Sequence, residues 1–210
     1  MRKVLFSALI LVIFASCSGA ETIKLPKPAK TGGMPLYEAI SNRRSDREFA
    51  DKAITLQELS DLLYVTAGVN RPDGYRTYPV AMGIQDIFVY VFTKDGVCKY
   101  DALSHSLEVI AEGDHRQETG MQPFVGKAAV NLAYVQDLSL WEGKRGGKEL
   151  ASQWGFAHAG AVTQNAYLFA ASKGWNAVVR GSFDSEKLSK LMKLNEDQQI
   201  KLINTIGPRP

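Results

Sequence analysis

The sequence predicts an α+β domain, and three observations lead to this prediction. Apolar segments with strand character come in runs that are interleaved unevenly with helical segments, which favours α+β over a doubly wound sheet. Hydrophobic residues make up 45% and charged residues 22% of the 210-residue chain, an ordinary globular composition. Roughly 190 residues remain after an N-terminal leader, enough for one domain with a full core. The net charge of +3 is small and no repeat of aromatic and basic residues occurs, so no nucleic-acid partner is expected.

The N-terminus has the layout of a secretory signal. Two basic residues precede the apolar run Val4–Phe14, and small residues and Cys17 follow. The run is too short to span a membrane comfortably, so residues 1–20 are predicted to be a signal peptide. Cys17 follows two small residues, as in a bacterial lipobox, which predicts lipidation; ordinary cleavage after Ala20 is the alternative. Both predict export to the periplasm or cell envelope, and lipidation adds attachment to a membrane.

Composition after the leader suggests an extended segment and then one domain. Residues 21–33 are rich in Pro, Lys and Gly and are predicted to form a flexible tether or extended arm before a single domain over residues 34–210. If Cys17 carries lipid, Cys98 has no partner and is expected to be a small buried side chain rather than a nucleophile. The three histidines lie far apart with no Cys or carboxylate at ligand spacing, so no metal site is predicted.

Four segments have helical patterns. The first predicted helix begins at Pro35 and ends around residues 42–44, and the others span about residues 56–67, 148–172 and 185–192. Thr55 and Glu58 form a capping-box pattern ahead of the second helix, whose apolar stripe ends at Gly68. Ser185 is expected near the cap of the fourth.

Apolar runs predict the strands. The run Ile87–Phe92 is apolar throughout, as in a strand that is buried on both faces. The turn 94–96 leads into a return strand over residues 97–100, which predicts a hairpin. Further strands are expected near residues 107–110, 128–135, 175–179 and 200–206. The polar, glycine-bearing segments 70–83 and 136–147 are expected to be loops.

A cluster of cations follows the first predicted helix. It consists of Arg43, Arg44 and Arg47 with Ser45 among them. Arginine presents a planar fork of donors that suits phosphate oxygens, and the serine hydroxyl adds another donor. The chain has no Walker loop and no G-x-G-x-x-G segment, so an anionic ligand would be held by side-chain cations. The alternative is a solvated helix end, where cations offset the helix dipole.

Four blocks along the mature chain occur in an informative order. They are Arg43–Phe49; Leu59–Leu63 with Ala67–Arg71; Arg76–Gly83 running into Ile87–Val91; and Gly160, Gln164–Ala166, Gly174 and Arg180–Asp184. Each block alone is weak, but together they resemble the nitroreductase family of FMN-dependent oxidoreductases over nearly the whole mature chain. The pairs Tyr100-Asp101 and His105-Ser106 look most like the SagB-type branch, which is named for dehydrogenases of peptide-toxin maturation.

This resemblance implies a nitroreductase-like fold: a central, mostly antiparallel sheet flanked by helices, in an intertwined homodimer with FMN at the subunit boundary. The residues implied to contact the cofactor are Arg43, Arg44, Ser45, Arg47, Ala81, Met82, Gly83, Arg180, Gly181 and Arg209. The arginines and the serine near position 45 would hold the ribityl phosphate and flavin edge. The backbone N–H of Arg180-Gly181 would face flavin N5, and Arg209 is assigned to the phosphate from its position near the C-terminus.

The implied activity is electron transfer through flavin N5 to or from a small molecule. The substrate would be a nitro- or quinone-type acceptor, or the reaction would be a SagB-like dehydrogenation. No residue stands out as a catalytic acid or base, as expected where the flavin performs the chemistry. Related sequences commonly carry polar residues where Val80 and Met82-Gly83 stand here. This difference supports the alternative, an exported non-catalytic flavin-binding module on the same fold.

Overall fold

The computed structural model describes residues 21–210, so the predicted signal peptide and Cys17 lie outside the described residues. The strands are β1 (Thr22–Lys24), β2 (Ile87–Phe92), β3 (Gly96–Asp101), β4 (Ser106–Glu112), β5 (Val130–Asp137), β6 (Trp175–Arg180) and β7 (Gln198–Pro208). The helices are α1 (Leu36–Asn42), α2 (Leu56–Ala67), α3 (Gly147–Ser172) and α4 (Ser185–Leu191), and the 3₁₀ turns are η1 (Ala81–Gly83), η2 (Arg116–Thr119), η3 (Pro123–Gly126) and η4 (Leu138–Trp141). Within this part of the chain, no helix combines the length and the apolar character needed to cross a bilayer.

The strands form one antiparallel sheet. Their order is β1-β4-β3-β2-β5-β7-β6, and each neighbouring pair runs antiparallel. The predicted α+β class is therefore confirmed. The predicted hairpin is the β2–β3 pair, in which Phe92 lies opposite Val97. The weakly indicated strand near residue 107 is a full strand, because its pairing with β3 continues from Ser106 to Glu112.

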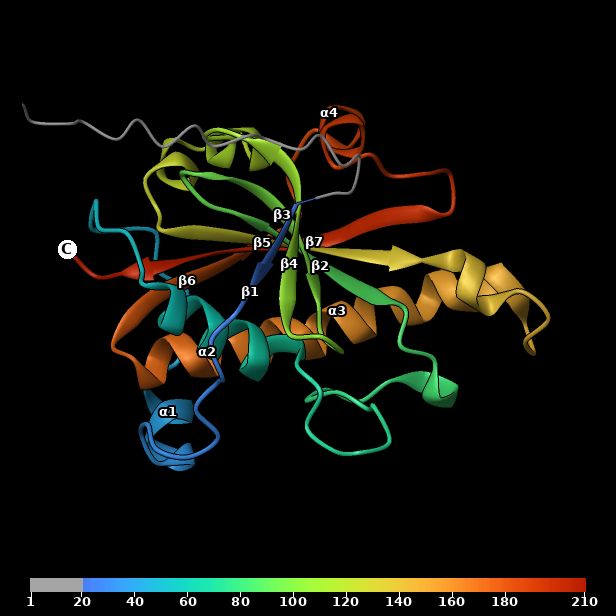
Figure 1. Ribbon diagram of the computed structural model, residues 1–210, viewed down its shortest axis with the longest axis horizontal. Helices are drawn as coiled ribbons and strands as arrows, with labels where there is room; N and C mark the ends of the chain where they lie inside the picture. The colour runs from blue at the N-terminus through green and yellow to red at the C-terminus, as the bar shows by residue number, and fades with distance from the viewer. Residues whose placement is uncertain (1–20) are drawn as a thin grey trace, which may run out of the picture.

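Helices cover both faces of this sheet. α1, α2 and α3 lie on one side and α4 lies on the other (Figure 1). The central strand β2 shows the division, since Ile87, Val89 and Val91 enter the core beneath α2 and α3. Tyr90 and Phe92 enter the smaller core beneath α4. Burying each large apolar side chain contributes about 1.5–3 kcal/mol, so the continuous apolar run predicted here holds the two layers together.

The N-terminal caps of α2 and α4 lie where the sequence predicted them. Thr55 Oγ1 accepts the Glu58 N–H at 3.2 Å, and the Glu58 carboxylate accepts the Thr55 N–H at 2.8 Å, which confirms the capping box. At α4, Ser185 lies next to the cap, as predicted. Asp184 is the N-cap, because its carboxylate accepts the Lys187 N–H at 3.0 Å.

α1 ends at Asn42, within the predicted range and just before the arginines. Arg43 has extended backbone (φ −63°, ψ 121°), so the chain leaves the helix there. The Asp46 N–H then donates to the Ala177 carbonyl at 2.9 Å, and Asn176 Nδ2 donates to the carbonyl of Glu48 at 2.6 Å. These bonds lay the arginine segment along β6, an edge strand of the sheet.

Residues 21–33 do not form the flexible tether that composition suggested. β1 pairs with β4 at one edge of the sheet, and Leu25 is buried. Farther along, the Ala29 N–H donates to Asp61 Oδ1 of α2 at 2.8 Å. The alternative prediction, an extended arm, describes this segment, and the arm is bound to the sheet and to α2.

The loop predicted over residues 136–147 is shorter than expected. Its first two residues complete β5, and η4 follows directly. Trp141, at the end of η4, is fully buried and packs near Ala151 of α3. The segment around this tryptophan is polar in composition, so the sequence did not predict the small apolar cluster that Trp141 forms with Leu138 and Ala151.

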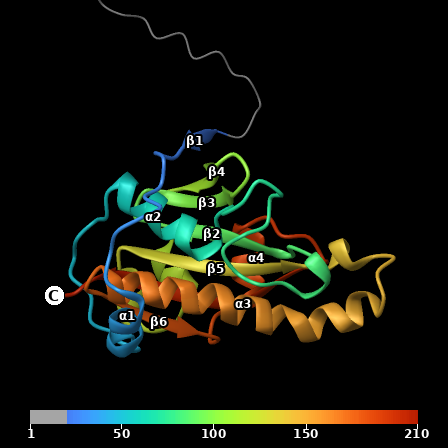
Figure 2. The ribbon, with the colours of Figure 1, turned by 90° about the horizontal axis from the view of Figure 1, so that it is seen from below.

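α3 packs lengthwise against one half of the sheet, mainly on β6 and β7, with α1 beside its C-terminal end (Figure 2). At Gly155 the helix lies close against side chains of the sheet. A Cβ atom there would collide with Gln136 Oε1 and lie 2.7 Å from Lys201 Cε. Only glycine permits this approach, since any other side chain begins with that atom. At Gly160, by contrast, an added Cβ would meet no atom within 4 Å.

The substitution Gly155→Ala is therefore expected to lower the free energy of unfolding by about 1–3 kcal/mol, because the added methyl group must displace Gln136 or the helix. Gly160→Ala is the control and should be neutral or stabilise by up to about 1 kcal/mol, since alanine favours helix. Urea unfolding followed by circular dichroism measures both. Equal stabilities of the two variants would contradict the close approach.

Candidate functional site

The arginine segment runs beside a buried tyrosine of α3. The Arg43 guanidinium lies 5.3 Å from the centroid of the Tyr167 ring. The hydroxyl oxygens of Ser45 and Tyr167 are 2.7 Å apart, and the Val179 N–H donates to the same Tyr167 hydroxyl at 2.8 Å. Tyr167 thus joins α3, β6 and the arginine segment, and it sets where Arg43 and Ser45 lie.

Arg44 and Arg209 come together next to this tyrosine. They line one shallow depression together with Tyr167. Arg44 Nε lies 3.5 Å from Asp46 Oδ2, an exposed ion pair that contributes little to stability. Both guanidinium groups are exposed, so they remain accessible to an anion. The structure therefore brings Arg43, Arg44 and Arg209 together around Tyr167; these three are called the arginine cluster below.

Arg47 faces a neighbouring groove. This groove of about 450 Å³ is lined by Arg47, Phe49, Phe124, Lys127 and Pro210. The ring centroids of Phe49 and Phe124 lie 6.1 Å apart, and the two rings form an apolar wall of the groove. Arg47 is thus close to the cluster in sequence, but it shares its surroundings with a second cation, Lys127.

The side chain of Arg180 points into the protein. Its Nη1 donates to the Thr119 carbonyl at 2.7 Å, its Nε to Thr205 Oγ1 at 2.9 Å, and its Nη2 to Asn131 Oδ1 at 3.3 Å. Desolvation by burial lowers the pKa of Arg180 to about 10. The side chain is structural, so any cofactor contact of this pair would come from the backbone. Gly181 suits that role, because it is exposed and an added Cβ would meet nothing within 4 Å.

The segment Ala81–Gly83 forms the 3₁₀ turn η1 rather than an irregular loop. Met82 has a positive φ of 55°, an unfavourable conformation for a non-glycine residue, and it is 56% exposed. Gly83 has φ 72°, and a Cβ there would lie 2.6 Å from Tyr75 Oη. The Ala81 N–H donates to His158 Nε2 at 2.8 Å, which ties the turn to α3.

The turn and the arginine cluster lie apart within one chain. His158 contacts the turn and Tyr167 contacts the cluster, and nine residues of α3 separate them. At 1.5 Å per residue and 3.6 residues per turn, they are about 14 Å apart along the axis and on opposite sides of the helix. A single copy therefore does not bring the predicted cofactor residues into one site.

Three buried residues that organise these regions were not among the predicted site residues: Tyr167, Asp86 and His158. His158 Nδ1 donates to Asp86 Oδ1 at 2.7 Å, joining the start of β2 to the middle of α3. One signal was present in the sequence, since Asp86 is an acidic residue directly before a strand buried on both faces. Within residues 21–210, no group of three or more His, Cys, Asp or Glu side chains is placed to hold a metal ion.

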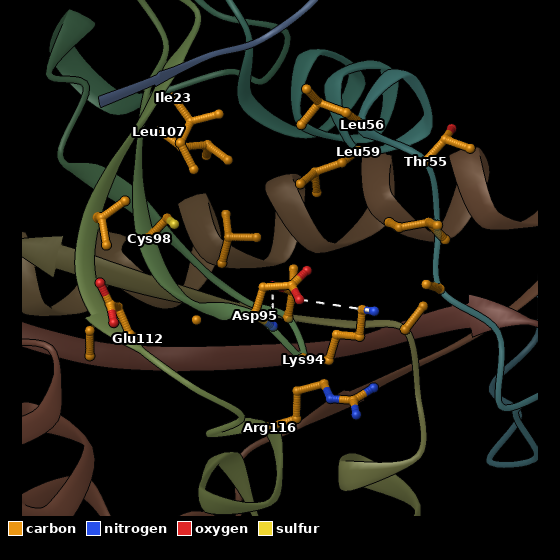
Figure 3. Close-up of a pocket in the computed structure, with 18 of the residues that line it drawn as sticks. Ile23, Thr55, Leu56, Leu59, Lys94, Asp95, Cys98, Leu107, Glu112 and Arg116 are labelled. Carbon is orange, nitrogen blue, oxygen red and sulfur yellow. Dashed lines mark hydrogen bonds and ion pairs between the residues drawn. The ribbon is translucent and has the colours of Figure 1, made fainter. Parts of the chain in front are cut away.

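A separate cavity of about 390 Å³ lies between α2 and the β3–β4 hairpin (Figure 3). Leu59 and Cys98 belong to its apolar side, and the Lys94–Asp95 pair and Arg116 lie opposite them. Burial raises the pKa of the Cys98 thiol, so the neutral form is favoured, consistent with a packing role. No residue that was predicted to bind cofactor lines this cavity.

The fold and the arginine cluster define an α+β protein that presents guanidinium donors suited to phosphate oxygens at one edge of its sheet. Residues 40–208 match the model of the Nitroreductase family, and the chain belongs to this family, which makes it an oxidoreductase. A nitroreductase structure from Ralstonia eutropha is similar at 40% identity, with 90% of each chain covered and a TM-score of 0.83. A relative from Methanocaldococcus jannaschii that is named as a nitroreductase is 29% identical over 174 residues, or 77% of this chain and 85% of the relative.

Two more distant structures share the fold alone. A chain of the Escherichia coli microcin synthetase McbBCD complex is 19% identical, with 99% of this chain and 85% of that chain covered and a TM-score of 0.68. A structure from Staphylococcus epidermidis described as an NAD(P)H:FMN oxidoreductase is 13% identical, with 87% and 91% covered and a TM-score of 0.64. These likenesses agree with the nitroreductase-like fold.

The inward position of Arg180 makes a prediction about stability. Arg180→Gln removes the donors to the Thr119 carbonyl and to Asn131 Oδ1, so it should lower the free energy of unfolding by about 2–4 kcal/mol. Arg145→Gln, at an exposed position in the turn before α3, should change it by less than about 0.5 kcal/mol. Urea unfolding of the cofactor-free proteins gives both values. A wild-type stability for the Arg180 variant would refute its structural role.

Proposed function

We propose that the protein is an FMN-dependent oxidoreductase that transfers electrons to a small electron-poor acceptor of the nitroaromatic or quinone type. The observation that carries this proposal is the arginine cluster around Tyr167 in a chain of the nitroreductase family. Guanidinium groups bind phosphate oxygens in pairs of charge-assisted hydrogen bonds. FMN, when bound, supplies the hydride-transfer chemistry, while the protein supplies binding and orientation.

The described residues fit this cofactor. Arg43, Arg44 and Arg209 would bind its phosphate, and Ser45 would add a hydroxyl already oriented by Tyr167. The exposed backbone at Gly181 leaves room for a flat ring to approach the N–H. Arg47, in the adjoining groove, would lie toward the flavin edge. A cation at that place favours the negative charge that develops on reduction.

We also propose that the working form is an intertwined homodimer. α1 and α3 leave large apolar side chains in solvent, among them Tyr37 at 86% and Phe156 at 57% exposure, together with Leu36 and Trp154. Exposed apolar side chains of this kind mark interaction surfaces. A second copy on this face would bring the η1 turn of one chain toward the arginine cluster of the other. The separation of the two regions along α3 supports this arrangement.

A dehydrogenation of the SagB type is a second candidate reaction. Its support is the fold shared with a chain of the microcin synthetase McbBCD complex, a complex with truncated pro-MccB17 bound. Reduced nicotinamide is a cytoplasmic donor, whereas an exported dehydrogenase would take electrons from its own substrate. This reading therefore suits an exported chain.

The non-catalytic alternative depends on η1. Met82 is exposed where related sequences commonly carry a polar residue, and Val80 replaces a serine. Loss of a flavin-contacting hydrogen bond would leave a module that binds flavin without turnover. Reduction experiments separate this possibility from the enzyme.

Export and lipid anchoring through Cys17 complete the proposal. Cys17 and the apolar run before it are their basis, and both lie outside the described residues. A lipidated Cys17 would hold the protein on the membrane of the cell envelope.

The arginine cluster gives the test of cofactor binding. Arg44→Gln should weaken FMN binding about tenfold or more, because it removes charge-assisted bonds worth about 1.5–3 kcal/mol. Arg145→Gln, in the exposed turn before α3, is the matched control and should bind FMN as the wild type does. Quenching of flavin fluorescence on titration measures the dissociation constants.

The FMN-loaded wild type then distinguishes the three readings. An enzyme should lose its flavin absorption with reduced nicotinamide under anaerobic conditions and regain it when a quinone is added. A spectrum that stays oxidised against a panel of donors, peptides included, would favour the non-catalytic module. A protein that takes up no FMN would refute all three, since each requires bound flavin.

The proposed anchor is tested at the N-terminus. Mature chains isolated from the native membrane should begin at Cys17 and carry the mass of a lipid, and Cys17→Ala should release the protein from that fraction. Intact-mass spectrometry of both fractions makes the measurement. A soluble chain that begins at Glu21 would show ordinary cleavage instead.

A further inference from the structure

A buried carboxylate lies beneath the η1 turn. Asp86 is fully buried and accepts hydrogen bonds from His158 Nδ1 at 2.7 Å, Gln136 Nε2 at 2.6 Å and Trp141 Nε1 at 2.8 Å. Burial acts to raise the pKa of Asp86, but the hydrogen bonds from these three side chains together hold that pKa below its ordinary value. Asp86 is therefore a charged acceptor at the junction of β2, β5, η4 and α3.

The partners of His158 determine where its proton lies. The Ala81 N–H can only donate, so His158 Nε2 must be an unprotonated acceptor. The proton is then on Nδ1, where it is donated to the Asp86 carboxylate. Asp86 thus orients the imidazole ring and makes its outer nitrogen the better acceptor, as a carboxylate does for a histidine that binds a metal.

The hydrogen bond from Ala81 carries this orientation to the turn. η1 is closed by the Ile84 N–H, which donates to the Ala81 carbonyl at 3.0 Å. Between them Met82 is held at φ 55° with its side chain in solvent. That conformation is unfavourable for a residue with a side chain, so contacts at both ends of the turn must maintain it. Asn165, two helical turns from His158 on the same side of α3, binds the Thr77 carbonyl at 3.1 Å and holds the chain that leads into the turn.

We infer that Asp86 and His158 are positioning residues that hold η1 in the conformation in which it contacts the flavin. This inference rests on the proposed function for the flavin, but the anchor itself is a property of the protein alone. Burying the Asp86 carboxylate costs desolvation free energy. Apolar side chains would pack α3 on the sheet without that cost. The orientation of the ring toward Ala81 is what this network provides beyond packing.

Two substitutions of His158 separate positioning from packing. His158→Asn retains a donor where Nδ1 stood and can bind Asp86, but its side chain is too short to reach the Ala81 N–H. His158→Gln places an acceptor near the former Nε2 and can bind Ala81, while the donor to Asp86 is lost. If the histidine serves packing alone, FMN affinity will follow stability, and the Asn variant will be the better binder. If it positions the turn, the Gln variant will be the better binder although it is the less stable protein.

The decisive experiment measures FMN affinity, the visible circular dichroism of bound FMN and amide hydrogen exchange. His158→Asn should weaken FMN binding about tenfold relative to His158→Gln and alter the flavin dichroism, since one hydrogen bond at the turn is lost. In the cofactor-free protein, peptides that cover residues 78–84 should exchange faster in the Asn variant than in the Gln variant. His115→Asn, which alters a surface ion pair with Glu118, should leave all three measurements at wild-type values.

The outcomes are distinguishable. Equal affinities in the two His158 variants, or affinities that follow their unfolding temperatures, would overturn the positioning role. A wild-type protein that binds no FMN would refute the proposed function and the flavin contact, and the exchange comparison would still decide whether His158 anchors the turn. Unchanged exchange over residues 78–84 in His158→Asn would refute the anchor.

Discussion

The close packing of α3 against the antiparallel sheet is the constraint on which the rest of the structure depends. Near its N-terminal half, Gly155 lets the helix approach Gln136 and Lys201 more closely than any other residue would allow. Near its other end, the Tyr167 hydroxyl accepts the Val179 N–H of β6. Because a helix of 26 residues is a stiff element, contacts at its two ends fix both regions that the flavin would use.

These two regions differ in how they are built. The arginine cluster is open and cationic, with Arg43 against the Tyr167 ring and Arg209 Nε donating to Asn176 Oδ1 at 3.0 Å, as suits a site for an exchangeable anion. The η1 turn is small and strained, and a desolvated polar network lies behind it. Structures commonly depart from the most stable arrangement where function requires a fixed geometry. Met82 in its unfavourable conformation above a buried carboxylate is such a departure.

The sequence predicted what local patterns specify. The capping box at Thr55, the hairpin and the α+β class follow from neighbouring residues and strand periodicity, and all were found. Trp141 was missed because its burial depends on Asp86, which is distant in sequence. Arg180 stood in a recognisable motif, but the direction of its side chain depends on how β6 aligns with β7 and β5. Such pairing between strands cannot be read from a single sequence. For the same reason, the sequence did not predict the hydrogen bond between Asp86 and His158 in the middle of α3.

The two edge strands, β1 and β6, have a consequence for how an anchored protein would stand on a membrane. Cys17 is five residues before Thr22, so a lipid on that cysteine would keep the β1 edge within about 18 Å of its attachment point. Six strand spacings, about 29 Å, separate β1 from β6, beside which the arginine segment runs. If the strand order ran perpendicular to the membrane, the arginine cluster beside β6 would therefore face the aqueous compartment, far from the lipid surface. In that orientation, water-soluble electron carriers would reach the arginine cluster more readily than carriers dissolved in the bilayer.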